Sequence, residues 1–242
     1  ISMDPSDGGG WCQCEACKEM GSVSDRVVFL SNQVAEAINK LGHGDKYVGI
    51  YAYNYHSLPP SVELHPKVIP SLATAFIKGD QTFAKMLTGW SKKSELMGIR
   101  EYYGVPVWHA SMPGTGRAGN PRGLARSIRK QYAAGARFIN AESDEAWGPH
   151  GLGYYVASRL LWDVETPEDE VIDEFLTKCF GAAKEPMREF YEFMASSPRQ
   201  SDHMVGTMYR KLKAARQLTT APAVIERIDD LVLYTRYVEL KM

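Results

Sequence analysis

The sequence predicts an α/β fold with a parallel sheet, followed by a region that is helical throughout. Segments with strand character alternate with amphipathic segments up to Glu142, and no segment after Gly151 has convincing strand character. Parallel strands need helical crossovers between them, so this alternation favours βα units over an antiparallel meander. We therefore expect an α/β domain over residues 1–150 and a helical region over residues 151–242.

The elements of the first part follow from apolar spacing and from Gly and Pro signals. "ISM" resembles the end of a strand, and the next helix begins near Ser24 or Asp25, carries one apolar stripe and ends at Gly42. The remaining predicted elements are strands near 47–55, 67–73, 97–103 and 137–142, and helices over 82–94 and 122–135.

The second part divides into five helical segments. The first is "GLGYYVASRLLWD", the second has Pro167 in its first turn and Gly181 at its end, and the third is "EPMREFYEFMASS". Two long amphipathic segments follow Ser201. The chain starts at what reads as a strand end and stops within helical periodicity, so we expect an internal fragment whose parent continues upstream.

Composition and charge exclude several classes of partner. The chain has 28 basic and 29 acidic residues, with no basic stripe and no like-charge block, which argues against binding to nucleic acid or to an anionic membrane. Its glycine run at 8–10 is not followed by Lys-Ser or Lys-Thr and does not form a dinucleotide fingerprint, so we expect no nucleotide cofactor. A neutral or small polar substrate fits better.

Residue parity along the predicted strands identifies candidate site residues. In "ARFINAES", Ile139 and Ala141 form the helix-facing set, so Asn140 and Glu142 share the opposite face, near the strand end where active sites of parallel α/β folds lie. Glu101 is helix-facing by parity, but it stays a candidate because terminal strand residues often leave the register. The same parity places further residues beside Glu142: Asp4, Tyr51, Tyr53, Tyr55, Arg100 and Tyr102.

Carboxylates together with aromatic rings favour a carbohydrate site. Sugar rings stack on Tyr and Trp, and glycosidic cleavage needs a protonated carboxyl group at the leaving oxygen. Trp147 follows the acidic cluster and is the best candidate for a subsite wall, and Trp108 is a second candidate for substrate binding. His109 and His150 lie in predicted loops, where a lone histidine is usually solvated.

Several of these motifs together resemble a known family. They are "DPSDGGGWCQCEAC", "SDRVVFLSNQVAEAI", "YAYNY" with "LPP", "REYYG" and "AESDEAWGPHGLGYYVASRLLWD", and they resemble the bacterial domain of unknown function 4838, which is related to glycoside hydrolase family 163. The resemblance implies that the chain is the second half of a (β/α)8 barrel of the TIM type, with the missing strands and an accessory domain upstream. It also implies export to the periplasm or the cell exterior.

The resemblance further implies an activity and roles for residues. Characterised members are endo-β-N-acetylglucosaminidases acting on N-glycans, in which the substrate's own 2-acetamido group serves as nucleophile. Carried over, Glu142 is the general acid/base, and Asp7, Asp4 or Glu101 is the orienting or subsite carboxylate. The sequence does not decide which of these three assists. No metal or other cofactor is expected in the reaction.

Each assignment has a structural alternative. Glu142 could cap a helix or pair with an arginine, Asp4 and Asp7 suit an Asx turn beside Pro5, and the tyrosines could fill a core. At the level of function, the alternatives are a non-catalytic carbohydrate-binding barrel and an exo-acting hydrolase such as an α-glucuronidase-like enzyme. The latter needs an inward cation, for which Arg100 is the candidate.

The sequence does not decide whether the four cysteines bind a metal ion, form a disulfide or remain free thiols. Cys12, Cys14 and Cys17 form C-x-C-x-x-C, and Cys179 is far away in the sequence. A zinc site needs a fourth ligand and lacks the usual paired knuckles here, so the sequence favours a disulfide between two of the three or free thiols.

Overall fold

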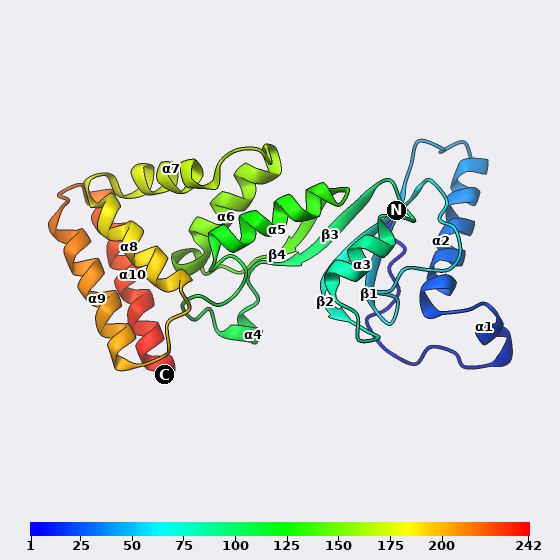
Figure 1. The fold of residues 1–242 in the computed structure, drawn as a ribbon, viewed down its shortest axis with the longest axis horizontal. Coiled ribbons are helices and arrows are strands. Elements are labelled where there is room, and N and C mark those ends of the chain that lie inside the picture. Colours follow the sequence, from blue (N-terminus) through cyan, green and yellow to red (C-terminus); the bar gives the residue numbers. More distant parts are fainter. The chain divides into compact units, whose positions relative to one another are not determined.

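The computed structural model describes residues 1–242, which form four strands, ten α-helices and one 3-10 helix (Figure 1). Contacts divide the chain into two compact units, the first formed by residues 1–101 and 130–141 and the second by residues 102–129 and 142–242. In chain order the elements are α1 (Glu15–Glu19), α2 (Val23–Lys40), β1 (Val48–Asn54), β2 (Val68–Ile77), α3 (Phe83–Trp90), β3 (Met97–Tyr102), α4 (Pro106–His109), α5 (Pro121–Ala133), β4 (Ala136–Glu142), α6 (Trp147–Trp162), α7 (Glu168–Phe180), η1 (Gly181–Ala183), α8 (Lys184–Ala195), α9 (Asp202–Gln217) and α10 (Pro222–Lys241).

The strands form one parallel sheet in the order β1-β2-β3-β4. Val48 of β1 is opposite Val68 of β2, and Leu72 of β2 is opposite Ile99 of β3. Each strand begins and ends within one residue of its predicted bounds, except that β2 ends four residues later, so the predicted alternation of parallel strands with helices is confirmed. A short strand-like pairing joins Ser2 to Gly49 in parallel, as the pattern of "ISM" predicts.

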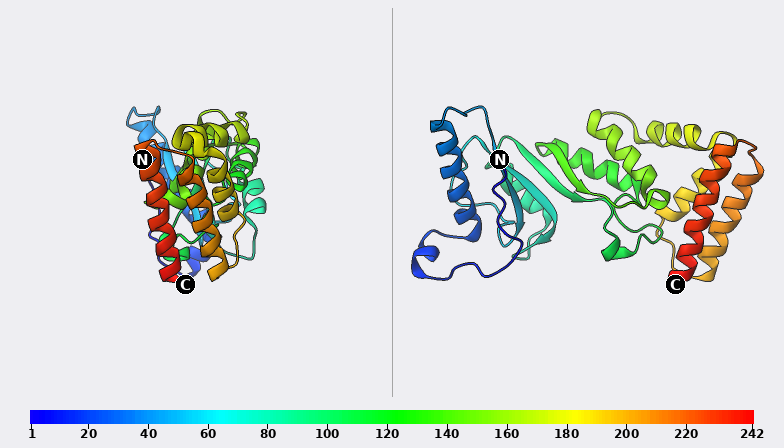
Figure 2. Two further views of the ribbon diagram at one scale, coloured as in Figure 1. Left: turned by 90° about the vertical axis from the view of Figure 1, so that its left-hand side faces the viewer. Right: turned by 180° about the vertical axis from the view of Figure 1, so that it is seen from behind.

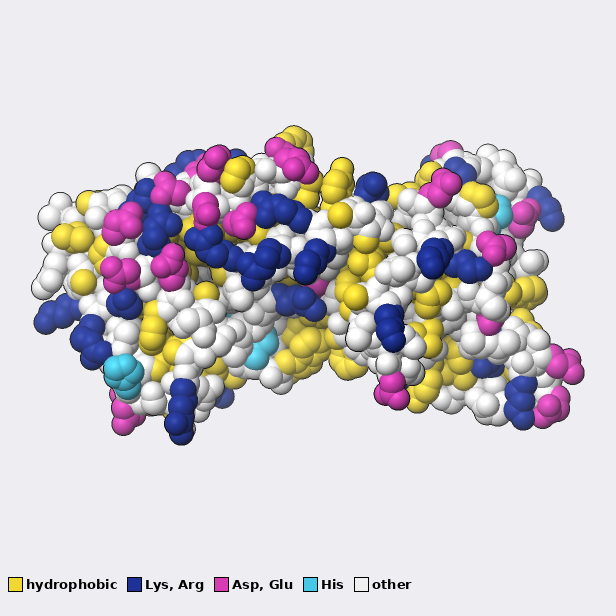
Figure 3. All heavy atoms as spheres, viewed as in Figure 1, with side chains coloured by type: hydrophobic (Ala, Val, Ile, Leu, Met, Phe, Trp, Pro, Cys, Tyr) yellow, Lys and Arg dark blue, Asp and Glu magenta, His cyan; other side chains and the backbone are white.

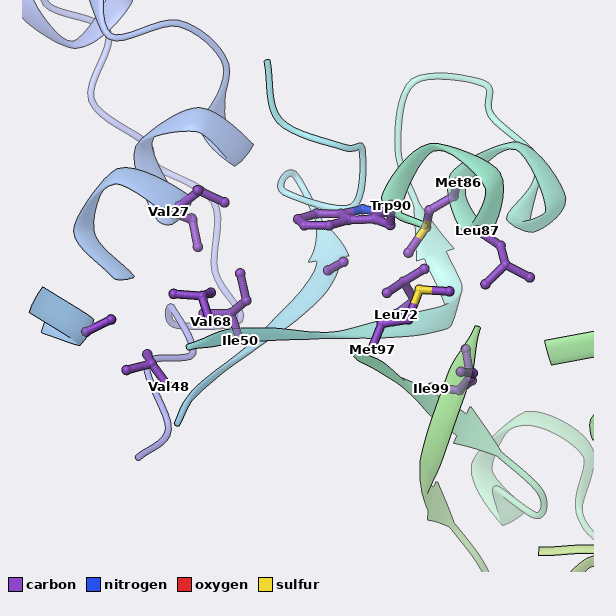
Figure 4. Close-up of a cluster of buried hydrophobic side chains, with 14 residues drawn as sticks. Val27, Val48, Ile50, Val68, Leu72, Met86, Leu87, Trp90, Met97 and Ile99 are labelled. Atoms are coloured by element: carbon purple, nitrogen blue, oxygen red, sulfur yellow. The ribbon is translucent and has the colours of Figure 1, made fainter. Parts of the chain in front are cut away.

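One face of the sheet is covered by helices and carries the core of the first unit (Figure 4). Val48 and Ile50 of β1 pack there with Val27 of α2 and Trp90 of α3. Trp90 is almost completely buried, and its indole N–H donates to the Ser57 carbonyl oxygen at 2.8 Å. Full burial of a large apolar side chain contributes about 1.5 to 3 kcal/mol, so this face fixes the register of the strands.

Helix α2 begins with a reciprocal cap. The Ser22 hydroxyl accepts a hydrogen bond from the backbone N–H of Asp25, and the Asp25 carboxylate accepts one from the backbone N–H of Ser22. The other carboxylate oxygen of Asp25 accepts bonds from the N–H and hydroxyl of Ser61, which ties the loop before β2 to the helix start. The helix therefore starts at Val23, one or two residues before its predicted position.

The second unit is helical from α6 onward, which confirms the prediction for residues after Gly151. Pro167 is the N-cap of α7 and Gly181 its C-cap, close to their predicted places. Helices α9 and α10 lie side by side in both views of Figure 2 and contact one another, and both carry buried apolar side chains, among them Met208, Leu212 and Leu231. None of the helices combines the length and the apolar composition that a membrane span requires.

Charged side chains of both signs are interspersed over the exposed surface of the second unit (Figure 3). Arg129 pairs with Glu168 at 2.7 Å, and Asp173 pairs with Lys184 at 2.6 Å and with Arg188 at 2.5 Å. Exposed pairs of this kind contribute at most about 1 kcal/mol each. These pairs neutralise part of the charge of this surface.

Candidate functional site

The face of the sheet opposite the helices carries the polar residues that parity placed there. Tyr51, Ser71 and Asn140 line a hollow of about 470 Å³, together with Asp4 and the exposed side of Phe138. Their strand neighbours Ile50 and Leu72 are buried on the helix-covered side. We call this surface the open face.

Arg100 connects two strands across the open face. Its guanidinium Nη1 donates to Oδ1 of Asn140 on β4 at 2.7 Å, and its Cζ lies 5.7 Å from the ring centre of Tyr51 on β1. A cation at this distance from an aromatic face is attracted by the ring quadrupole. The open face therefore presents an oriented guanidinium, an amide and an aromatic ring together, and this combination suits a polar ligand with hydroxyl groups.

Asp4 is bound to the backbone at the edge of the open face. Its Oδ1 accepts a hydrogen bond from the Tyr51 N–H at 2.6 Å, and its Oδ2 accepts one from the Ser2 hydroxyl. Both carboxylate oxygens are thus engaged in fixing residues 1–4 against β1. The local role is structural, but these bonds go to Tyr51 and Ser2 and do not form the Asx turn that the sequence suggested.

Asp7 and the remaining tyrosines lie beyond the strand end. Asp7 is exposed, and a Cβ added to Gly9 in the same loop would lie 3.7 Å from the ring of Tyr55. Tyr55 follows the end of β1, where Asn54 has a positive φ of 50°, so it leaves the strand alternation and is half exposed. Tyr53 makes edge contacts with the rings of Phe76 and His56.

Glu101 lies on the other side of the sheet from Arg100. Its side chain is 1% exposed, and its two oxygens accept hydrogen bonds from the Thr74 hydroxyl and the Gln131 side-chain amide, each at 3.1 Å. Gln131 belongs to α5, so this carboxylate faces the helix layer, as strand parity predicts. Rotation out of register at the end of β3 does not take place at this residue.

Glu142 is the last residue of β4. Its carbonyl oxygen accepts bonds from the N–H groups of Tyr103 and Gly104, at 2.8 and 3.3 Å, and its side chain is half-buried. Strand side chains alternate, so Asn140 and Glu142 leave β4 on the same side.

Two tryptophans of the second unit stay exposed. Trp108 of α4 is 49% exposed and packs at 5.0 Å on Tyr102, while Trp147 at the start of α6 is 66% exposed and packs edge-on at 5.3 Å against Tyr154. Large apolar rings are usually buried, so exposed rings held by a second aromatic side chain fit binding surfaces.

A buried polar network lies just after Glu142 and is not apparent in the strand pattern. The Asp144 carboxylate accepts hydrogen bonds from Tyr154 Oη at 2.6 Å and from Ser111 Oγ at 3.0 Å, and it contacts His150 Nδ1 at 3.0 Å. Nε2 of His150 lies 3.1 Å from the Thr115 carbonyl oxygen. The expectation that His150 is solvated is wrong, because it lies in the first turn of α6 and is fully buried.

The pKa shifts within the network agree with its hydrogen bonds, in which Asp144 accepts and Tyr154 donates. Burial alone would raise the pKa of Asp144, but the hydrogen bonds from His150 and Tyr154 outweigh it and the net shift is downward. Burial and the bond to Asp144 raise the pKa of Tyr154, so its hydroxyl stays a donor. Burial lowers the pKa of His109, which also lies near His150. The sequence contains one indication of this network: His150 and Tyr154 are four residues apart, so they lie on the same face of a helix.

Comparison with known proteins identifies the family. The sequence profile described as Domain of unknown function (DUF4838) matches residues 1–192, most of the chain. The chain belongs to this family. No curated protein and no solved structure matches it. The DUF4838 match includes the whole sheet, the open face and the Asp144 network, and it ends within α8, so α9 and α10 follow it.

The DUF4838 region also contains the three clustered cysteines. Cys12 and Cys14 are exposed, Cys17 is half-buried, and none is in a disulfide. Their sulfur atoms lie within 4.8 Å of one another. Among the chain's histidine, cysteine and acidic side chains, this is the group whose arrangement could hold a metal ion.

Proposed function

We propose that the protein is a glycoside hydrolase that cleaves a glycosidic bond in a glycan containing N-acetylglucosamine. The observation that carries the proposal is the open face, where Tyr51 and Asn140 line a hollow and Arg100 is bonded to Asn140, on the strand that ends in Glu142. The resemblance to glycoside hydrolase family 163 supports the same reaction class.

The side chains of the open face suit a sugar more than an apolar ligand. A pyranose ring offers C–H faces for the Tyr51 ring and hydroxyl groups for the Asn140 amide. The exposed rings of Trp108 and Trp147 supply further stacking surfaces in the second unit. A hollow of about 470 Å³ is within the usual size of small-molecule sites.

Glu142 is the proposed general acid and base. In the first step its carboxyl group protonates the glycosidic oxygen while the 2-acetamido oxygen of the substrate attacks C1, so the C1–O bond to the leaving group breaks and an oxazolinium ion forms, with the N–H proton retained. In the second step Glu142 takes a proton from water, whose oxygen attacks C1 and opens the oxazolinium ring, which restores the neutral acetamido group and the protonated Glu142. The configuration at C1 is retained.

Among the three candidates for an assisting carboxylate, Asp7 fits best. Asp4 has both oxygens engaged by Tyr51 and Ser2, and Glu101 is buried beneath α5. Asp7 is exposed in the loop that Asp4 anchors. Its role in the proposal is to orient the acetamido group and to stabilise the positive charge that develops on it.

Arg100 favours one alternative, an exo-acting hydrolase for sugars that carry a carboxylate. A guanidinium on the open face could bind a uronate through two parallel hydrogen bonds. Its bond to Asn140 and its contact with Tyr51 hold it in the sheet, which fits a neutral hydroxyl group equally well.

Product analysis tests the proposal. The full-length protein is incubated with intact N-glycans and with N-acetylglucosamine oligosaccharides, and products are identified by mass spectrometry and anomeric configuration by NMR. We expect internal cleavage with retention. Release of terminal uronic acid alone would support the exo-acting alternative, and binding measured by calorimetry without any cleavage would make the protein a carbohydrate-binding one.

A further inference from the structure

The first segment of the chain packs only in part against the core of the first unit. No residue from Ile1 to Val23 is buried, and α1 buries none of its side chains. Ordering a residue costs about 1 to 2 kcal/mol in backbone entropy, which apolar burial usually offsets. Met3, Trp11 and Val23 are partly buried against the core, and the stretch between Trp11 and Val23, which holds the cysteines, contributes no residue to it.

The three cysteines lie in this loop at distances that fit a shared metal ion. Their sulfur atoms lie within 4.8 Å of one another, and those of Cys12 and Cys14 are 3.4 Å apart. Tetrahedral zinc with Zn–S bonds of about 2.3 Å places its sulfur ligands about 3.8 Å apart. A disulfide requires about 2.0 Å and would leave the third thiol without a partner.

A cation lies beside the cysteine cluster. Nη1 of Arg26 donates to the Cys12 carbonyl oxygen at 2.8 Å, and its guanidinium lies 5.8 Å from the ring of Trp11. A cation beside three thiolates offsets part of the negative charge that remains after a divalent ion binds.

We propose that Cys12, Cys14 and Cys17 bind one thiophilic divalent metal ion, with Zn²⁺ as the expected occupant. Three thiolates supply three of the four positions, and water fills the fourth, because the cluster is open to solvent. The metal cross-links the loop between the Asp4 anchor and α2. This site is independent of the proposed hydrolase activity.

Metal content tests the site directly. The full chain is purified with Zn²⁺, and bound metal is measured by mass spectrometry; Co²⁺ is then titrated into apoprotein while thiolate-to-cobalt charge-transfer absorption is recorded. We expect one equivalent of metal, lost in Cys14→Ser and kept in the matched control Cys179→Ser, whose sulfur lies outside the cluster. Equal metal content in the two variants would overturn the proposal.

A second measurement needs no variant. The protein is treated with iodoacetamide and, separately, with trypsin, each with Zn²⁺ or with a chelator. Zn²⁺ should protect the three clustered thiols from alkylation and slow cleavage after Lys18 in α1, while cleavage after Lys46 keeps its rate. Reduced thiols that react equally under both conditions would exclude the metal site. A mass two hydrogens lower, with one free clustered thiol, would show a disulfide instead.

Discussion

Nη1 of Arg100 donates a hydrogen bond to Oδ1 of Asn140 at 2.7 Å, joining β3 to β4 on the open face of the sheet. The two residues belong to neighbouring parallel strands, and each follows a helix-facing residue. The bond orients the Asn140 amide and fixes the guanidinium beside Tyr51. The polar groups of the open face are therefore held in place before any ligand binds, which lowers the entropy lost on binding.

The substitution Arg100→Gln should lower the catalytic efficiency, kcat/KM, of the proposed hydrolase. A hydrogen bond to a charged group is worth about 1.5 to 3 kcal/mol, so kcat/KM should fall about 10- to 100-fold. The measurement compares kcat/KM with that of Arg137→Gln, which removes an arginine bonded to backbone carbonyls at the start of β4. An equal effect of both substitutions would argue against a binding role for Arg100. A loss confined to uronate substrates would favour the exo-acting alternative.

Asp25→Asn should destabilise the first unit in a pH-dependent way. Burial alone would raise the pKa of Asp25, but hydrogen bonds from Ser22 and Ser61 lower it from 3.8 to about 2. A carboxylate with a depressed folded pKa adds stability that is present above pH 3.8 and is lost as the pH falls towards 2. The shift corresponds to about 2 kcal/mol at neutral pH.

Urea unfolding of wild type and Asp25→Asn at several pH values measures this contribution. The difference between the two should be largest at neutral pH and should shrink below pH 3.8. Asp45→Asn is the control, because Asp45 is exposed and pairs with Lys46 in a surface loop. A difference that does not change with pH would mean that the cap acts through packing and not through the charge of Asp25.

Asp144→Asn should destabilise the second unit strongly. The carboxylate is buried and contacts His150, Tyr154 and Ser111, and each hydrogen bond to a charged group contributes about 1.5 to 3 kcal/mol. Because its pKa is lowered, the contribution of Asp144 is present above the ordinary range of an aspartate and is lost as the pH falls below it. Denaturant unfolding followed by circular dichroism measures the change.

Tyr154→Phe provides the graded comparison, since it deletes one neutral donor and leaves the His150 contact. Its cost should be about 1 to 2 kcal/mol, well below that of Asp144→Asn. Equal costs for the two variants would mean that the network is held together by packing around Tyr154.

Strand parity predicted much of the open face. It separated buried Ile50 from Tyr51, and it placed Arg100 and Asn140 on one side, because side chains alternate along every strand. It also assigned Glu101 to the helix layer, which the bond from Gln131 confirms. The prediction that Tyr55 follows the same alternation was wrong. Tyr55 lies beyond the end of β1, and the positive φ of Asn54 ends the alternation before it.

The Asp144 network could not be predicted from local pattern. Its members Ser111 and Thr115 come from the segment between α4 and α5, and the packing that buries His150 between them exists only in the folded unit. The cysteine cluster was visible as C-x-C-x-x-C, but the sequence favoured a disulfide or free thiols. The distances between the sulfur atoms depend on the turn before α1, and spacing alone does not fix them.

Glu142→Gln tests the proposed chemistry. The amide keeps the size and most hydrogen bonds of the side chain but cannot donate a proton to the leaving oxygen. In the full-length enzyme, kcat should fall by a factor of about 10² to 10⁴, while binding of the intact glycan changes little. The loss should shrink for substrates with an activated leaving group, because their departure hardly needs protonation.

Glu145→Gln is the matched control, since Glu145 is an exposed carboxylate three residues further along the chain. Its kcat should equal that of the wild type on both kinds of substrate. An equal loss in Glu142→Gln on activated and unactivated substrates would refute the general-acid role. Wild-type activity in that variant would remove Glu142 from the site, and the general acid would then have to be sought among the remaining carboxylates, beginning with Asp7.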